Sequence, residues 1–226
     1  MKELKRNKSN CKYAGVSAAV IAVLAVVVMA GTARAVTMTA EPDDFSPGSN
    51  ISNSFDGITL SSEGTGWNNP SGGIFAVDPE NDQLEPFPAS TGGLVFGTDD
   101  SSFPHLFREL GFLAFRADFA APTNRVSLDF IGNDSADTGL LEAYNASGNL
   151  LGRALSPSLG LGEVANVSFQ SGNDDISYIL AGGQDRLSSL GIDNLQASSH
   201  APEPATLALL GTGLAGLLIL RRRRRR

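Results

Sequence analysis

Short runs of alternating apolar and polar residues are the feature that most limits the fold of this chain. In the segment FLAFRADF, residues 112–119, every second residue is apolar: Leu113, Phe115, Ala117 and Phe119. Side chains two residues apart lie on the same face of a β-strand, so this pattern predicts a half-buried strand. Residues 36–201 show no sustained period of 3.6 residues, which argues against a helical fold.

Similar runs recur along the chain between clusters of Gly, Asn, Asp, Ser and Pro. One of them, ISYILA, predicts that Ile176, Tyr178 and Leu180 share a face. Two links favour hairpins: AAPTN at 120–124, and Ala146-Ser147-Gly148, where glycine suits a positive φ. About eight to ten such strands predict an all-β fold, a single antiparallel β-sandwich of jelly-roll type.

The predicted sandwich contains no cysteine, because the only cysteine is Cys11 near the start of the chain. Its stability must therefore come from an apolar core rather than from disulfides. The chain has 12 phenylalanines, most of them in the predicted strands, which supply the bulk that such a core needs.

The first 35 residues have the layout of a secretory signal peptide. Five basic residues, Lys2, Lys5, Arg6, Lys8 and Lys12, precede an uncharged and mostly apolar stretch at 13–33. Ala33 and Ala35 then provide the small side chains that signal peptidase requires, so we expect cleavage before Val36. The alternative is an uncleaved anchor, since 21 residues span about 30 Å as a helix.

The part of the chain that would be exported is strongly acidic. Residues 36–201 contain 22 carboxylates, five arginines and no lysine, a net charge of −17. A body of this charge repels nucleic acid, so nucleic acid is not an expected partner.

The end of the chain, APEPATLALLGTGLAGLLILRRRRRR, combines three features. Residues 205–220 form an uncharged apolar run that would extend about 24 Å as a helix, which is short for a permanent membrane span. A run of basic residues follows it and would stay on the cytoplasmic side: Arg221, Arg222, Arg223, Arg224, Arg225 and Arg226. Pro202, Glu203 and Pro204 place a rigid, accessible charge before the apolar run.

These three features in this order resemble the PEP-CTERM sorting signal of Gram-negative bacteria, whose domain is also labelled an ice-binding protein C-terminal domain. The resemblance implies that an exosortase, a membrane transpeptidase, recognises Pro202-Glu203-Pro204 and hands the protein to the envelope or the exopolysaccharide matrix. The segments RVSLDFIG, LEAYNASGNLLG and LGIDNLQ are similar, less specifically, to β-sandwich ectodomains that precede this signal, some of which resemble galactose-binding-like modules.

The body offers little for catalysis. His105 and His200 are its only histidines, and neither accompanies a Gly-x-Ser-x-Gly motif. No catalytic residues and no obligatory cofactor are therefore expected. Paired carboxylates for glycoside hydrolysis stay open, because their spacing across a sandwich is invisible in sequence.

Calcium is one candidate ligand. Asn133, Asp134 and Asp137 gather oxygen ligands in one loop, although without the spacing of an EF-hand. The alternative is that Asn and Asp simply favour turns. Asp193, an acid inside an apolar strand, is expected either to face outward or to engage a cation or a backbone donor.

Sugar is the other candidate ligand, because aromatic rings stack on sugar rings. Trp67 lies in a loop-forming segment, and Tyr144 and Tyr178 lie in predicted strands. The alternative is that the tryptophan anchors its loop and that the tyrosines belong to the core.

We therefore expect an exported, non-enzymatic surface or matrix protein that interacts with polysaccharide, with signal peptidase, an exosortase and the membrane as its partners. The alternative is a secreted hydrolase that acts on exopolysaccharide and carries the same sorting signal. The expected organisation is a signal peptide (1–35), a sandwich domain (36–195), a spacer (196–201) and a sorting signal (202–226).

Overall fold

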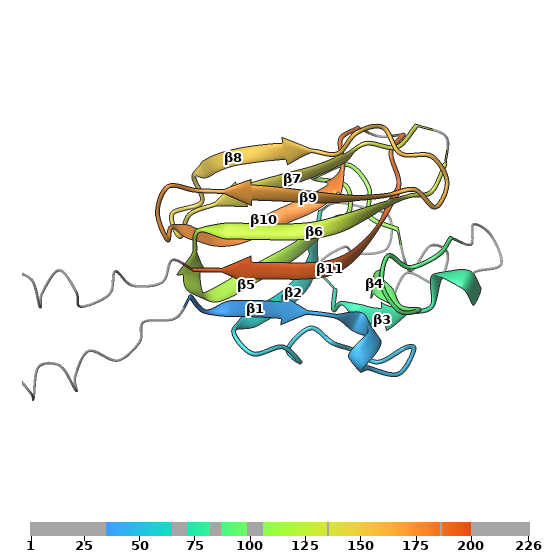
Figure 1. The fold of residues 1–226 in the computed structure, drawn as a ribbon, viewed down its shortest axis with the longest axis horizontal. Helices are drawn as coiled ribbons and strands as arrows, with labels where there is room; N and C mark the ends of the chain where they lie inside the picture. The colour runs from blue at the N-terminus through green and yellow to red at the C-terminus, as the bar shows by residue number, and fades with distance from the viewer. Residues whose placement is uncertain are drawn as a thin grey trace, which may run out of the picture. The chain divides into compact units, whose positions relative to one another are not determined.

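A computed structural model gives the fold of the body and describes residues 35–64, 72–81, 87–98, 106–134, 136–185 and 187–199 (Figure 1). Residues 36–200 form one compact unit. The expected signal helix and the expected helix at 205–220 lie outside the described residues. None of the helical segments within the described ranges has the length and apolar character that crossing a bilayer requires.

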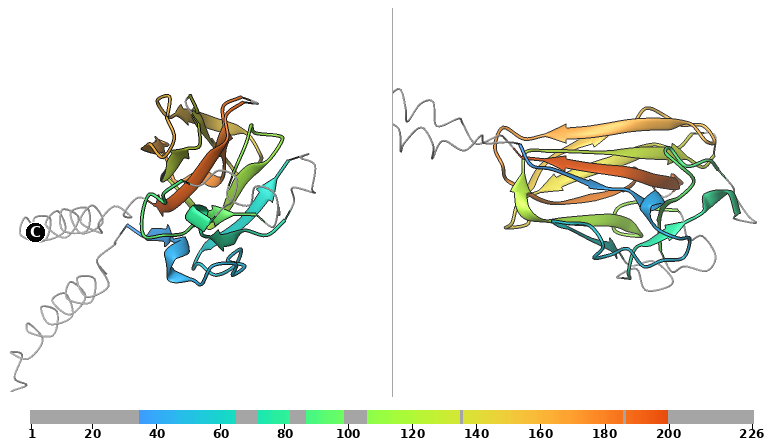
Figure 2. Two further views of the ribbon diagram at one scale, coloured as in Figure 1. Left: turned by 90° about the vertical axis from the view of Figure 1, so that its right-hand side faces the viewer. Right: turned by 60° about the horizontal axis from the view of Figure 1, so that its bottom comes forward.

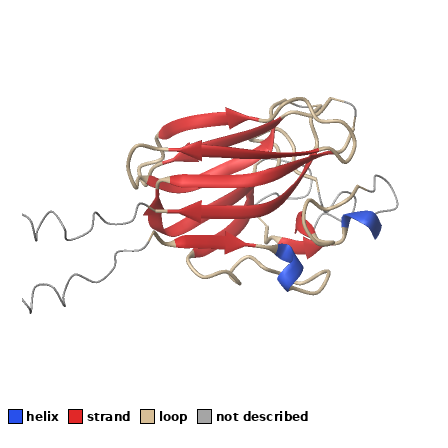
Figure 3. Cartoon of the chain, viewed as in Figure 1, coloured by secondary structure: helices blue, strands red, loops and turns tan. Residues whose placement is uncertain are grey.

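In the described residues eleven strands form two antiparallel sheets, which confirms the predicted all-β sandwich (Figures 2 and 3). Sheet A has the order β3-β4-β11-β6-β9, with β1 also paired to β11, and sheet B has the order β2-β5-β10-β7-β8. The strands of sheet A are β1 (Thr37–Ala40), β3 (Phe75–Val77), β4 (Val95–Gly97), β6 (Arg125–Gly132), β9 (Val164–Gln170) and β11 (Leu190–Ser198). Those of sheet B are β2 (Ile58–Glu63), β5 (Ala114–Thr123), β7 (Gly139–Tyr144), β8 (Leu150–Leu155) and β10 (Ile176–Gly183).

The helices of the described chain are two single turns of 3-10 type, η1 (Pro42–Asp44) and η2 (Pro79–Asn81). Proline begins both turns, where its missing N–H has no partner to lose.

The core lies between the sheets, where the alternating residues of the strands meet. The predicted inward set of β5 is confirmed for Phe115, Ala117 and Phe119, which are all buried. Phenylalanine rings join the layers: the ring of Phe115 in sheet B lies 4.9 Å from that of Phe96 in sheet A, measured between centroids. Such contacts supply the stability that disulfides would otherwise provide.

The link at 120–124 does not make a hairpin, contrary to the sequence prediction. β5 pairs with β2 and β10, whereas β6 pairs with β9 and β11, so the chain passes from sheet B to sheet A between Thr123 and Arg125. Asn124 fixes this corner, because its N–H donates to the carbonyl of Ser198 and its carbonyl accepts from Ser171. Alternation predicts the two strands but not the sheet to which each belongs.

The link at 146–148 does make the predicted hairpin, between β7 and β8. Gly148 has a φ of +77°, a conformation that glycine adopts without strain. The side-chain oxygen of Asn145 accepts hydrogen bonds from the N–H groups of Ser147 and Asn149, which closes the turn.

The face predicted for ISYILA was wrong because the pairing of β10 with β5 is irregular at its start. Its pairing with β5 shifts register between Ile176 and Tyr178. After this shift Ile179 and Ala181 enter the core. Tyr178 and the alternate residue Leu180 are only partly buried and lie on the opposite, outer face, because side chains alternate along the strand.

The last strand continues to Ser198, beyond residue 196 where we expected the spacer to begin. β11 is held there from both sides, because Ser198 pairs with Thr37 of β1 and with Arg125 of β6.

Candidate functional site

The outer surface of sheet B presents two rows of side chains that the register places side by side. One row runs across the strands as Thr59, Asp118, Tyr178, Tyr144 and Leu150, and the next as Ser61, Arg116, Leu180, Glu142 and Arg153. We call the six residues Arg116, Glu142, Tyr144, Leu150, Arg153 and Tyr178 the tyrosine face.

The two tyrosines form a stack across neighbouring strands. The rings of Tyr144 on β7 and Tyr178 on β10 are 4.9 Å apart between centroids and nearly parallel, with an angle of 3°. The guanidinium carbon of Arg116, on β5, lies 3.9 Å from the centroid of the Tyr178 ring. Because β5 and β7 flank β10 on opposite sides, Tyr178 is held between a cation and a second ring.

Arg116 is fixed by two carboxylates. Its Nε and Nη2 donate to Asp118 at 2.7 Å each, and its Nη1 donates to Glu63 at 2.8 Å. These bonds, above all those to Asp118, raise the pKa of Arg116 above its ordinary value. The guanidinium is therefore a fixed, permanent charge beside the stack rather than a group that exchanges protons.

Glu142 connects the stack to the edge of the sheet. It accepts a hydrogen bond from the hydroxyl of Tyr144, and its other oxygen lies 3.8 Å from Nε of Arg153. Burial and this hydrogen bond raise the pKa of Tyr144, so the phenol stays protonated. The Glu142 side chain is only 13% exposed, whereas that of Arg153 is 61% exposed.

Beside Tyr144, on the side away from Tyr178, the register places Leu150 of the edge strand β8, which is 42% exposed. The tyrosine face thus combines an aromatic ring, an exposed apolar side chain, a carboxylate and a largely exposed guanidinium. This combination can stack on the apolar face of a sugar ring and hydrogen-bond its hydroxyls.

Asp193 is not part of the tyrosine face and has a structural role. It is fully buried, and it accepts hydrogen bonds from the backbone N–H groups of Ser90 and Thr91, at 3.1 Å each, and of Asn194, at 2.8 Å. Of the alternatives that the sequence left open, the structure shows a carboxylate engaged with backbone donors. These bonds tie the loop before β4 to sheet A.

Three carboxylates, Glu41, Asp129 and Asp193, share two hydroxyl groups in this region, and we call these three residues the acid staple. The Ser90 hydroxyl lies 2.9 Å from Asp129 and 2.8 Å from Asp193, but it has one hydrogen to donate. The Thr91 hydroxyl likewise lies 3.1 Å from Glu41 and 3.3 Å from Asp193.

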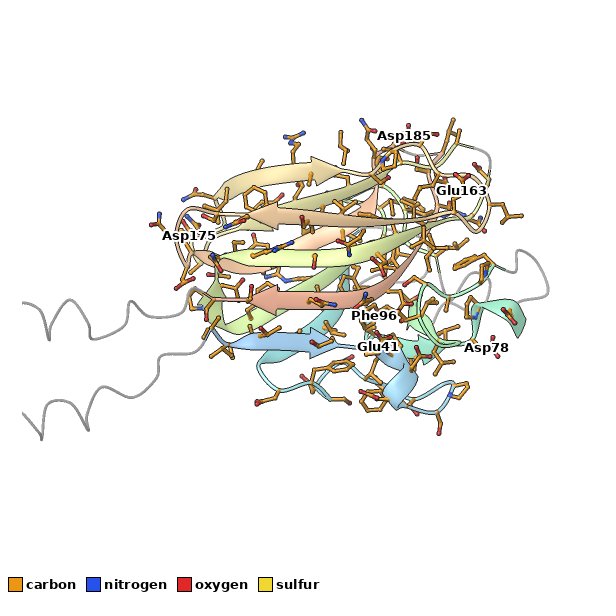
Figure 4. All side chains as sticks on the ribbon, in the orientation of Figure 1. Glu41, Asp78, Phe96, Glu163, Asp175 and Asp185 are labelled. Carbon is orange, nitrogen blue, oxygen red and sulfur yellow. The ribbon has the colours of Figure 1, made fainter. Side chains whose placement is uncertain are left out.

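Two carboxylates of this cluster, Glu41 and Asp193, bind protons more tightly than usual. Burial and the charge of Asp193 raise the pKa of Glu41 to about 7, above its ordinary 4.5. Burial also raises the pKa of Asp193. Glu41 follows β1 directly and is labelled in Figure 4.

The calcium candidates Asn133, Asp134 and Asp137 lie in one loop, where Asp137 is engaged with backbone donors. Asp137 accepts hydrogen bonds from the backbone N–H groups of Asn133, Asp134 and Ser189, and Asp134 accepts one from Ala136. Burial raises the pKa of Asp137. In the described part of the chain, no group of three or more His, Cys, Asp and Glu side chains is placed to hold a metal ion.

Several predicted positions lie outside the described residues: Ala33, Trp67, His105, His200, Pro202 to Pro204 and Arg221 to Arg226. Ala35 is described and is exposed. Sequence reasoning named both tyrosines but missed Arg116, Glu142 and Arg153. For Arg116 the information was present, because the alternation of β5 already turns this residue outward.

Fold and site together define an antiparallel β-sandwich with an open, aromatic sheet face. Residues 200–225 match the PEP-CTERM protein-sorting motif, which confirms the resemblance of the chain end to this signal. The chain thus carries a PEP-CTERM sorting motif at residues 200–225. The motif implies processing by an exosortase and export to the cell envelope or surface.

Several solved structures are distantly similar to the chain. The K2 cleaved adhesin domain of Lys-gingipain is 11% identical with a TM-score of 0.43, over 72% of this chain and 99% of that one. The K1 cleaved adhesin domain, from Porphyromonas gingivalis W83, is 13% identical with a TM-score of 0.30, over 73% and 99%.

A part of endo-1,4-beta-D-xylanase 10B of Clostridium thermocellum, complexed with xylohexaose, is 10% identical with a TM-score of 0.37, over 72% of this chain and 28% of that one. None of the curated protein sequences matches the chain. Likenesses of this degree carry no information on function.

Proposed function

We propose that this protein is a non-catalytic module of the cell surface or extracellular matrix that binds polysaccharide through the tyrosine face. The observation that carries the proposal is the fixed stack of Arg116, Tyr178 and Tyr144, which ends beside the exposed Leu150. The sorting motif supports a location where polysaccharide is at hand.

The ligand in this proposal is a sugar ring without strong charge. Every charged group of the tyrosine face has a partner of opposite charge, so the face does not select for an anion or a cation. A sugar ring would lie against Tyr144 from the side of β8. Glu142 and Arg153 would then hydrogen-bond neighbouring hydroxyls, with Arg153 free to move because it is largely exposed.

Absence of catalysis is part of the proposal. A glycosidase needs two carboxyl groups that reach the scissile bond from opposite sides. Two carboxylates with raised pKa values, Glu41 and Asp193, belong to the acid staple, where Asp193 is fully buried and bonded to three backbone N–H groups. The third, Asp137, is also buried and accepts bonds from three backbone N–H groups. They hold loops in place and are not available to a polymer.

The test is retention of the full chain, in detergent, on the exopolysaccharide of its host. We expect Tyr144→Ala to lower retention about tenfold, because loss of a stacking ring removes about 1 kcal/mol or more. The matched control is Val164→Ala, an exposed residue on the outer face of the other sheet. Release of reducing ends by the unaltered protein would instead support the alternative, a secreted hydrolase.

A further inference from the structure

Several strand edges of the body are covered by its own chain. Beside β3, the N–H of Ala76 donates to the carbonyl of Ser49 at 3.0 Å. Beside β2, the N–H of Leu60 donates to the carbonyl of Ser52 at 2.7 Å. The edges of β8 and β9 lie next to each other, where the two sheets meet. An edge that is covered in this way cannot take up a strand from another chain.

The outer edge of β1, at the border of sheet A, is open (Figure 1). β1 runs antiparallel to the end of β11, and the N–H of Ser199 donates to the carbonyl of Val36 at 3.1 Å. Hydrogen-bonded positions alternate along an antiparallel pair, so the N–H and C=O groups of Thr37 and Thr39 point away from β11. Both threonines are exposed, and no backbone group among the described residues is bonded to this side of β1.

β1 also lacks the features by which proteins keep edge strands apart. Its sequence, TMTA, has no charged residue and no proline, and its pairing with β11 has no shift in register. The next residue, Glu41, is turned to the hydroxyl of Thr91. Because the body carries a net charge of −17, two copies repel each other over most of their surface. The edge of β1 is a place where they can approach without opposing charges.

We infer that two copies of this chain pair through β1, edge to edge and antiparallel, so that sheet A continues from one copy into the other. A two-fold axis at Met38 places Thr37 of each copy opposite Thr39 of the partner copy. Each such pair exchanges two backbone hydrogen bonds. The threonine side chains lie side by side on the outer face of the sheet, where cross-strand Thr–Thr pairs are favourable.

The pairing is short and depends on a high local concentration of the chain. β1 has four residues, so its edge supplies few bonds. The sorting motif directs the protein to the envelope or surface, and display there holds many copies close together. The inference is independent of the proposed ligand, because the tyrosine face lies on sheet B.

The first experiment traps the pair with a disulfide. Thr37→Cys and Thr39→Cys are made separately in the full chain with Cys11→Ser, so that each copy has one thiol. Opposite residues have Cα atoms about 5.5 Å apart, within reach of a disulfide, whereas like residues are about 8 Å apart. The two variants mixed in detergent should therefore give at least about tenfold more linked dimer than either variant alone.

The matched control for the trap is Ser168→Cys, an exposed position on β9 of the same sheet. Mixed with Thr39→Cys, it should stay unlinked. Equal linking in both mixtures would show random collision and overturn the inference. Linking of Thr37→Cys with itself, in preference to Thr39→Cys, would overturn the antiparallel pairing.

The second experiment measures self-association of the full chain in detergent by sedimentation equilibrium. Thr39→Pro removes an N–H that points toward the partner copy and leaves the bonds to β11 in place. It should weaken self-association about tenfold or more, because half of the bonds between the copies are lost. Thr39→Val keeps the N–H and should associate like the unaltered chain.

Three results of this measurement would overturn the inference. One is an unaltered chain that stays monomeric at every concentration. Another is a proline variant that associates as strongly as the unaltered chain, which would place the contact elsewhere, for example in residues 205–220. The third is a valine variant as weak as the proline variant. If circular dichroism shows that the proline variant is unfolded, the disulfide trap decides alone.

Discussion

Glu41 is the residue whose titration should be visible in the stability of the whole body. Its pKa is about 7 when folded and 4.5 ordinarily, so the folded state binds the proton more tightly than the unfolded state. The stability that this proton contributes is fully present below pH 4.5 and is lost as the pH rises toward 7.

We therefore expect the free energy of unfolding to fall by about 1–2 kcal/mol from this source between pH 4.5 and 7, after allowance for partial exposure. Glu41→Gln should remove that part of the slope, because an amide does not titrate. Urea unfolding of both proteins at the two pH values measures this change in the free energy of unfolding. If the change were equal in the two proteins, Glu41 would not be its source.

Sequence predicts single residues only where the local pattern decides their environment. Asp193 was recognised as an acid in an apolar strand, but its donors, Ser90 and Thr91, lie about a hundred residues earlier in a loop. Asp129, directly opposite Asp193 in the sheet, could not be linked to it from the sequence. Such clusters depend on register, which alternation leaves undetermined.

The edges of the two sheets meet where β8 and β9 lie next to each other, and a glycine makes this closure possible. A Cβ placed on Gly152 of β8 would lie 2.4 Å from the ring of Phe169 on β9. The ring can therefore seal the open side of the sandwich only because the position has no side chain.

Gly152→Ala should destabilise the body by about 1–3 kcal/mol through overpacking, seen as a lower melting temperature. Gly172→Ala is the matched control, because a Cβ there meets nothing within 4 Å. If both substitutions changed the melting temperature equally, the contact with Phe169 would not be the cause.

At the scale of elements the sequence predicts the strands better than their arrangement. The hairpin of β7 and β8 follows from its turn residues, but the passage between sheets at Asn124 has the same composition as a hairpin. The irregular pairing of β10 with β5 after Ile176 leaves no mark in the alternation of ISYILA, although Tyr178 faces outward beyond it. For this reason the sequence pointed to Tyr144 and Tyr178 but did not show that both lie on one outer face.

The chain as a whole is divided into two units. Residues 36–200 form one compact unit, and the sorting motif at 200–225 falls almost entirely in the other. Units that do not share a core should respond independently to substitution.

We expect Glu203→Ala, or deletion of Arg221 to Arg226, to prevent sorting in the native host and to leave the melting temperature of the body and its retention on polysaccharide unchanged. Tyr144→Ala should do the reverse, with normal sorting and weak retention. Fractionation of the envelope and retention assays on the same strains measure both effects. Normal sorting of both tail variants would show that the motif is not what directs this protein, and loss of retention in them would show that the tail, rather than the tyrosine face, holds the polysaccharide.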